Sequence, residues 1–133
     1  LEKSNSCSCP QISITAGFPA ILSSTLDNLS AAAAAEHDEA YSIYPSFAQI
    51  AIDEGFEDVA NIFKEIAEVE KAHEARYLKL ADNVRQNKVF KKDNVVKWKC
   101  SNCGYLHTGS DAPAICPACQ HTIDYYELFV ENY

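Results

Sequence analysis

The sequence predicts a two-part fold, in which an all-α hairpin of two amphipathic helices is followed by a small β-rich metal-binding domain. Apolar residues recur every three or four positions over two long segments, which is the period of a helix with one buried face. Further along, two Cys-x-x-Cys pairs have the spacing of metal ligands. We therefore expect a loop or tail over residues 1–18, the helix pair and its linker over 19–95, and the metal domain over 96–133.

The composition excludes several classes of protein. An apolar fraction of 47% over 133 residues fits a globular chain. A net charge of −8 leaves no phosphate-neutralising patch and no polybasic anchor, and no apolar run is long enough to span a bilayer, so we expect neither a nucleic-acid nor a membrane partner. Because the start lacks a secretory pattern and four of the six cysteines have metal-ligand spacing, we expect a reducing, cytoplasmic setting.

The first segment, residues 1–18, is polar and small with no sustained periodicity, which predicts a loop. It holds Cys7 and Cys9, only two positions apart. We interpret them as unpaired surface thiols, because side chains at this spacing diverge and a mutual disulfide would be strained. A redox pair or additional metal ligands stay open as alternatives.

The first helix is expected to begin between Pro19 and Ser24, where proline and serine supply entry signals. The run of alanines at 31–35 favours helix and lets another helix approach closely. Pro45 interrupts the pattern, but the apolar stripe resumes in phase after it, so we predict a kinked, continuous helix that ends at Gly55.

The second helix, from about residue 57 to 87, follows at once and is therefore an antiparallel neighbour. Glu70 and His73 lie three positions apart on or beside its apolar stripe, and Glu36 lies on the stripe of the first helix. A carboxylate and an imidazole directed into a core are costly to desolvate unless a cation compensates them, and Glu-x-x-His on bundle helices is a di-iron pattern. A carboxylate on the apolar stripe of each of two neighbouring helices predicts a metal site more strongly than a carboxylate on one helix alone.

Two nearby side chains each have two alternative roles. Glu39 lies one turn beyond Glu36 and is either a further carboxylate of the site or a surface residue. Tyr44 lies about two turns beyond Glu36 on nearly the same face. It is either a donor to a ligating carboxylate or an ordinary core tyrosine.

The last part of the chain begins after a basic stretch over residues 88–97, which we interpret as a solvated linker, with docking to an acidic surface as the alternative. Short strands are expected at 98–100 and 105–107. So short a domain needs a structural metal, and four thiolates suit tetrahedral zinc or a single iron. The predicted ligands are Cys100, Cys103, Cys116 and Cys119, with His107 and His121 interpreted as surface residues.

The two parts together resemble the rubrerythrins, in which a ferritin-like di-iron bundle precedes a rubredoxin-like iron domain. The resemblance covers the chain from about Phe18 onwards and follows the family's motif order. It is carried by Ala34-Ala35-Glu36-His37-Asp38-Glu39, Tyr44-Pro45-Ser46-Phe47-Ala48, Glu54-Gly55-Phe56, Glu70-Lys71-Ala72-His73-Glu74, Trp98-Lys99-Cys100-Ser101-Asn102-Cys103-Gly104-Tyr105 and Pro113-Ala114-Ile115-Cys116-Pro117-Ala118-Cys119.

The resemblance implies a role for each site residue. Glu36 resembles a terminal carboxylate ligand, Glu70 a bridging one and His73 the imidazole ligand of one iron. Glu39 is similar to a carboxylate that enters or leaves the coordination sphere with oxidation state, and Tyr44 to a tyrosine that donates to the ligands. The four cysteines resemble the ligands of one rubredoxin-type iron, for which zinc is a possible substitute.

The family bundle has four helices, and this chain resembles only its last two. The resemblance thus implies a ferritin-like helical hairpin, half of the bundle, with the other half of the di-iron ligands outside this polypeptide. The sequence contains no methionine, from which we expect a processed or partial chain or one part of a split protein. We expect the N-terminal half of the bundle to be a separate chain, with pairing of two copies as the alternative.

The activity implied by the resemblance is that of a peroxidase, an oxidoreductase that reduces hydrogen peroxide to water in the defence against oxidative stress. The rubredoxin-like iron would relay electrons to the di-iron centre from a reductase or a rubredoxin. A ferroxidase that handles iron is the competing enzyme interpretation. A four-cysteine electron carrier or a zinc-ribbon interaction module is the competing non-enzyme interpretation.

Overall fold

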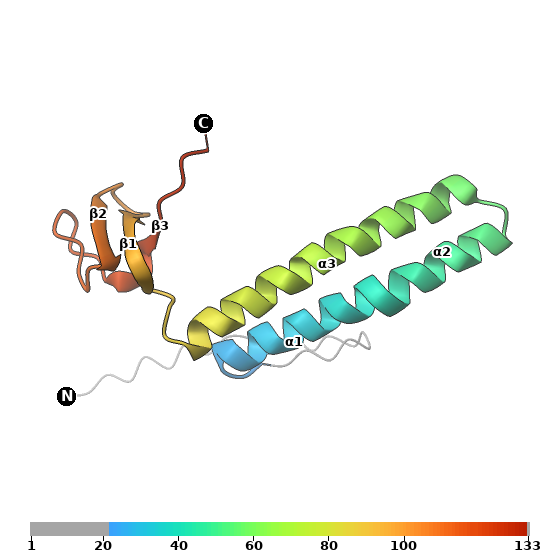
Figure 1. Cartoon of the computed structure of the whole chain (residues 1–133), viewed down its shortest axis with the longest axis horizontal. Coiled ribbons are helices and arrows are strands. Elements are labelled where there is room, and N and C mark those ends of the chain that lie inside the picture. The colour runs from blue at the N-terminus through green and yellow to red at the C-terminus, as the bar shows by residue number, and fades with distance from the viewer. Residues whose placement is uncertain (1–21, 133) are drawn as a thin grey trace, which may run out of the picture.

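The structure is a computed structural model that describes residues 22–132, a long helical hairpin followed by a small antiparallel sheet (Figure 1). The predicted tail, with Cys7 and Cys9, lies outside the described residues. In order, the elements are α1 (Thr25–Asp38), the π-helical turn η1 (Glu39–Ile43), α2 (Tyr44–Asp53), α3 (Glu57–Arg85), β1 (Lys91–Cys100), β2 (Leu106–Asp111), the 3-10 turn η2 (Ile123–Tyr125) and β3 (Tyr126–Leu128).

Helix α1 begins where the sequence supplies a capping pair. The Ser24 side chain accepts a hydrogen bond from the Asp27 backbone amide at 3.2 Å, and the Asp27 carboxylate accepts one from the Ser24 hydroxyl at 2.7 Å. This pairing satisfies one of the amides that the first turn leaves unpaired, and it places a negative charge at the positive end of the helix. The helix starts at Thr25, one residue beyond the predicted range, with Ser24 as its N-cap.

The first helix is continuous through α1, η1 and α2, as predicted, but it contains a π turn that the sequence analysis missed. The Tyr44 amide donates to the Glu39 carbonyl, five residues back, immediately before Pro45. One extra residue in a turn delays the helix by about 100°. In an uninterrupted α-helix Tyr44 would lie about 80° away from the direction of Glu36, and the π turn reduces this angle to about 20°. The insertion therefore brings Tyr44 onto the face of Glu36.

The turn between the helices depends on Gly55, as the sequence predicts. Gly55 has a φ of +82°, a conformation that favours glycine. Its amide donates to the Ile52 carbonyl at 3.0 Å, and the Phe56 amide donates to the Ala51 carbonyl at 2.7 Å. These two bonds form a Schellman motif, which ends α2 and returns the chain antiparallel to itself.

The two halves of the hairpin meet along a seam of alanines. Each of these residues is at most 5% exposed, and they are Ala33, Ala40, Ala48, Ala51, Ala60, Ala67 and Ala81. Small side chains let helix axes approach closely, near the lower end of the usual range of about 8–10 Å. The pair is therefore tightly packed, but it encloses few large side chains.

The larger apolar side chains of the hairpin lie outside this seam. Six that belong to the predicted apolar stripes are between 41% and 59% exposed, and they are Phe47, Ile50, Val59, Ile62, Val69 and Leu80. The stripes are thus real, yet in this single hairpin they do not form a core. None of the described helices has the length and apolar character needed to cross a membrane.

The sheet has the order β2-β1-β3, and both neighbours of β1 are antiparallel to it. Its core contains Trp98, Cys100, Ala112, Cys116 and Tyr126, all at most 7% exposed. So small a domain buries few large side chains between the sheet and the cysteine loops. Much of its stability must come from the metal that the cysteines bind.

The predicted linker over 88–97 is partly wrong, because β1 begins at Lys91. The strand begins this early because its first residues pair with the end of β2. The amide of Ala112, which follows β2, donates to the Phe90 carbonyl at 2.9 Å. The lysines of this stretch also have partners. Lys88 pairs with Asp93 at 2.7 Å, Lys91 pairs with Asp111 at 3.3 Å, Lys92 donates to a backbone carbonyl, and Lys97 lies over Phe129. They do not form a free basic patch.

Candidate metal centres

The first candidate centre is formed by the four predicted cysteines. Their sulfur atoms all lie within 4.8 Å of one another, and the Cys100–Cys119 and Cys103–Cys116 Sγ separations are 3.7 and 3.6 Å. A disulfide needs about 2.05 Å. A regular tetrahedron with metal–sulfur bonds of about 2.3 Å has edges of about 3.8 Å. The donor set therefore fits a single tetrahedral metal ion.

Two similar turns hold these sulfur atoms. In the first, the Gly104 amide donates to the Cys100 carbonyl at 2.8 Å, and the Cys100 amide donates to the Tyr105 carbonyl at 2.9 Å. In the second, Gln120 and His121 take the corresponding places, with distances of 2.9 and 2.7 Å. Gly104 and Gln120 both have positive φ, of 80° and 62°. The repeat of one turn explains why two Cys-x-x-Cys pairs create one site.

At two of the four sulfur atoms, those of Cys116 and Cys119, backbone amides favour the thiolate form. The His121 amide, opposed by burial, lowers the pKa of Cys119 to about 6. Burial alone would raise the pKa of Cys116, but the Cys119 and Ala118 amides oppose it, and that pKa is lowered. Metal binding requires thiolates, so these donors lower its cost. Cys103 is exposed, whereas Cys100 and Cys116 are buried, so the centre has one accessible side.

The second candidate centre lies between α1 and α3. One carboxylate oxygen from Glu36, one from Glu70 and a ring nitrogen of His73 lie within 4.8 Å of one another. His73 Nδ1 is 2.6 Å from Glu70 Oε2 and 3.3 Å from Glu36 Oε2. The three side chains that the sequence predicted to converge are therefore brought together, and they offer the oxygen and nitrogen donors that suit iron.

The electrostatics of this cluster also favour a cation. Glu70 is 8% exposed although it is a carboxylate. Burial and then the neighbouring Glu70 raise the pKa of Glu36, against the opposing effect of His73. The hydrogen bond to Glu70 raises the pKa of His73. The raised pKa values of Glu36 and His73 thus reflect negative charge held close together, which a cation between the two carboxylates would offset.

Glu39 and Tyr44 lie beside this cluster and not among its converging atoms. Burial, and then the charges of Glu39, Glu70 and Glu36, raise the pKa of Tyr44. This tyrosine therefore lies near enough to all three carboxylates for their charges to act on its hydroxyl. His107 and His121 contribute no atom to either cluster found in the described part of the chain.

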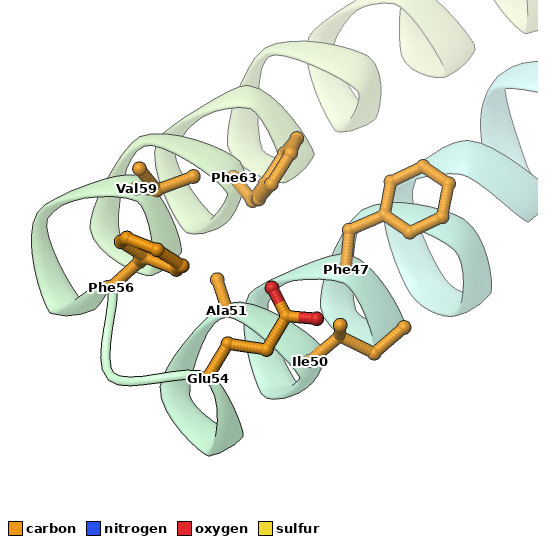
Figure 2. A pocket seen from close by; sticks show the side chains of 7 residues that line it. All are labelled: Phe47, Ile50, Ala51, Glu54, Phe56, Val59 and Phe63. Carbon is orange, nitrogen blue, oxygen red and sulfur yellow. The ribbon is translucent and has the colours of Figure 1, made fainter.

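Two of the open hollows on the hairpin bear on the candidate site and on the exposed apolar side chains. One, of about 460 Å³, is lined by Glu36, His73, Arg76, Tyr77 and Leu80 and so includes two of the three candidate ligands. The other, of about 510 Å³, lies near the turn at Gly55. Figure 2 shows Phe47 and Ile50 of α2 and Val59 and Phe63 of α3 around this second hollow. Its lining is apolar except for the Glu54 carboxylate.

Comparison with known protein families matches both parts of the chain. The family model "Rubrerythrin" matches residues 11–98, which includes the whole hairpin. The chain belongs to the rubrerythrin family. The model "Rubrerythrin, rubredoxin-like domain" matches residues 98–127, which includes all four cysteines. Rubrerythrins carry a di-iron site and a rubredoxin-like four-cysteine site, and the two clusters described above correspond to them.

Curated relatives agree with this assignment. The chain is 51% identical to a rubrerythrin of Clostridium perfringens over 92% of its own length and 63% of the relative's. For a rubrerythrin of Nitratidesulfovibrio vulgaris the corresponding values are 46%, 92% and 64%. Among solved structures, nigerythrin in a partially reduced state is 27% identical, with a TM-score of 0.46, and the match covers 84% of this chain and 54% of the nigerythrin chain. The chain thus spans less than two thirds of the curated rubrerythrins it matches.

The fold class predicted from the sequence is therefore confirmed, with a helical ferritin-like part followed by a small rubredoxin-like sheet domain. The sequence analysis missed two features close to the candidate centres. His37 pairs with Glu74 at 3.0 Å across α1 and α3, and each is adjacent in sequence to a candidate ligand, Glu36 or His73. Tyr126 is buried beside the cysteines, and nothing in the sequence separates it from the other aromatic residues near the C-terminus.

Proposed function

We propose that this rubrerythrin-family chain supplies one half of a non-haem di-iron peroxidase, which reduces hydrogen peroxide to water. Glu36, Glu70 and His73 would hold one side of the di-iron centre, with Glu39 as an additional carboxylate and Tyr44 as a hydrogen-bond donor to the ligands. The convergence of three metal-binding atoms within 4.8 Å on two separate helices is the observation that supports this most directly.

The chain's two centres suit different parts of one reaction. Hydrogen peroxide takes up two electrons and two protons to give two molecules of water. A di-iron centre supplies two electrons to an oxygen substrate, and a thiolate-bound iron exchanges one electron at a time. Cys100, Cys103, Cys116 and Cys119 fill all four positions of a tetrahedral site, so they favour electron relay from a reductase or a rubredoxin. The helical cluster borders an open hollow instead, which gives a small oxidant access.

We further propose that a second helix pair covers the exposed apolar face of this hairpin and supplies the remaining di-iron ligands. A di-iron bundle site uses a Glu and a Glu-x-x-His motif from each of two helix pairs, and this chain offers one such set. Exposed apolar area on this scale marks an interaction surface. The covering pair is either an N-terminal half outside this sequence or a second copy of the chain. Intact-mass and native mass spectrometry of the active protein distinguishes the two.

The four free thiols of the metal domain are compatible with a reducing compartment, and we place the protein in the cytoplasm. The same thiolates accept zinc or iron. The iron form is red and is bleached by dithionite, whereas a zinc form is colourless, so the two are separated by absorption and elemental analysis.

The decisive experiment uses the assembled, iron-loaded and reduced protein, mixed without oxygen with hydrogen peroxide. We expect reoxidation of the red centre in the unmodified protein, and at least a ~100-fold slower reoxidation in the double variant Glu70→Ala, His73→Ala, because the bridging carboxylate and the imidazole are lost. Before reduction, the double variant should show the same red absorption as the unmodified protein, because its cysteines are unchanged. Glu68→Ala, which removes an exposed carboxylate of the same helix, is the control.

Two results would contradict the proposal. If the double variant still consumes peroxide at the unmodified rate, the helical cluster is not the peroxidase site. If the unmodified protein reacts rapidly with dioxygen and ferrous iron but slowly with peroxide, the chain is a ferroxidase.

A further inference from the structure

Tyr126 is the first residue of β3, and it pairs with Cys100 of β1. Its side chain belongs to the core cluster that includes Cys100 and Cys116, and the residue is only 5% exposed. It therefore lies directly beside two of the four candidate iron ligands, although it is not a ligand itself.

The hydroxyl of Tyr126 is the only buried side-chain nitrogen or oxygen without a hydrogen-bond partner in the described part of the chain. An unpaired buried hydroxyl costs free energy, because it has given up its bonds to water. A phenylalanine would fill the same space without that cost. A tyrosine at this position is therefore favourable only if its hydroxyl can donate to an acceptor in some state of the protein.

The buried cluster around Tyr126 offers two sulfur atoms as possible acceptors, those of Cys100 and Cys116. Cys116 is the candidate acceptor, because the cluster packs its side chain against the tyrosine without any hydrogen bond between them. A tyrosine hydroxyl has a pKa of about 10, so it keeps its proton at neutral pH and remains a donor. A neutral thiol is a weak acceptor, but a metal-bound thiolate carries negative charge and accepts a charge-assisted bond.

We propose that Tyr126 donates a hydrogen bond to Cys116 Sγ when the four cysteines hold iron, and that this bond sets the reduction potential of the centre. The inference depends on iron in the four-cysteine site and not on peroxide chemistry. Reduction adds negative charge, which the four sulfur atoms share. The bond is consequently stronger in the ferrous state and raises the potential. Tyr126 is a positioning residue for the electron relay, and it touches no substrate.

The test compares Tyr126→Phe with the unmodified protein, using the full chain with iron in the four-cysteine site. We measure the equilibrium of electron exchange with a mediator dye of fixed potential, and the sulfur-to-iron charge-transfer absorption. In Tyr126→Phe we expect the equilibrium constant for accepting an electron to fall about threefold to tenfold, and a tenfold fall corresponds to about 59 mV for one electron. The absorption should move to lower energy, because the sulfur lone pair loses its stabilising donor.

Tyr125→Phe is the matched control, since Tyr125 is the adjacent residue and is 41% exposed. Its equilibrium constant should stay at the unmodified value. A Tyr126→Phe protein with unchanged equilibrium and absorption, or an equal change in both variants, overturns the proposal. If Tyr126→Phe fails to retain iron, crystals of the unmodified iron form decide instead. An Oη–Sγ distance to Cys116 of about 3.5 Å or less supports the proposal, and a longer distance overturns it.

Discussion

Replacing Ala67 by leucine tests whether the alanine seam holds both the fold and the helical metal site. Ala67 is 5% exposed and lies one turn before Glu70 on α3. Leucine adds three carbon atoms where helix α3 contacts the opposite helix, so the axes must separate or the side chain must adopt a strained rotamer. Overpacking of this kind costs about 1–3 kcal/mol.

The expected cost can be converted into a melting temperature. For a domain of this size, a loss of about 1 kcal/mol shifts the midpoint of thermal unfolding by about 4–8 °C. We therefore expect Ala67→Leu to lower the midpoint of thermal unfolding by about 4–24 °C. Far-ultraviolet circular dichroism measures this midpoint. Because the same separation moves Glu36 away from Glu70, iron bound at the helical site should fall as well, while iron at the cysteines remains.

Ala72→Leu provides the matched control, because Ala72 is exposed on the same helix. Leucine and alanine have similar helix propensity, so this change should leave the midpoint nearly constant. If Ala67→Leu is as stable as Ala72→Leu and binds the same iron, then close approach along the seam does not position the ligands. The reasoning about the seam would then be wrong.

Two further predictions concern a helix end and the cysteines. Hydrogen bonds from the Ser24 and Ser23 hydroxyls lower the pKa of Asp27 below 3.8, so its stabilising effect is present above that pH and disappears as the pH falls through the lowered pKa. Asp27→Asn should therefore lower the melting midpoint at neutral pH but not at a pH below the lowered pKa, where Asp27 is itself protonated, and an equal loss under both conditions would refute the charge argument. Cys103→Ser should abolish the red absorption while helical circular dichroism persists, and joint loss of both signals would show that the two domains fold as one unit.

Much of the fold is predictable because local chemistry determines it. Gly55 ends the first helix through a backbone conformation that favours glycine, and the two Cys-x-x-Cys pairs specify their turns. The convergence of Glu36, Glu70 and His73 also follows from the period of two stripes. In each case residues within a few positions of one another, or a known helical period, carry the information.

The failures arise where distant contacts decide the structure. Strand β1 begins at Lys91 because Phe90 and Lys91 find partners at Ala112 and Asp111, about twenty residues later in the chain. The π turn before Pro45 was missed because the apolar residues on either side of it were interpreted as one stripe of regular α-helical period, which leaves no place for an inserted residue. The unpaired hydroxyl of Tyr126 depends on packing that no sequence period reports.

The π turn at Glu39–Ile43 also bears on how this segment can change in evolution. Deleting one residue there would restore a regular α-helix, yet it would turn everything downstream by about 100° relative to α1. Ala48 and Ala51 would rotate out of contact with α3, and Tyr44 would leave the face of the metal ligands. A single-residue deletion in this turn is thus a change of the whole helix, whereas substitutions at its exposed positions, such as Ser42, alter only the surface.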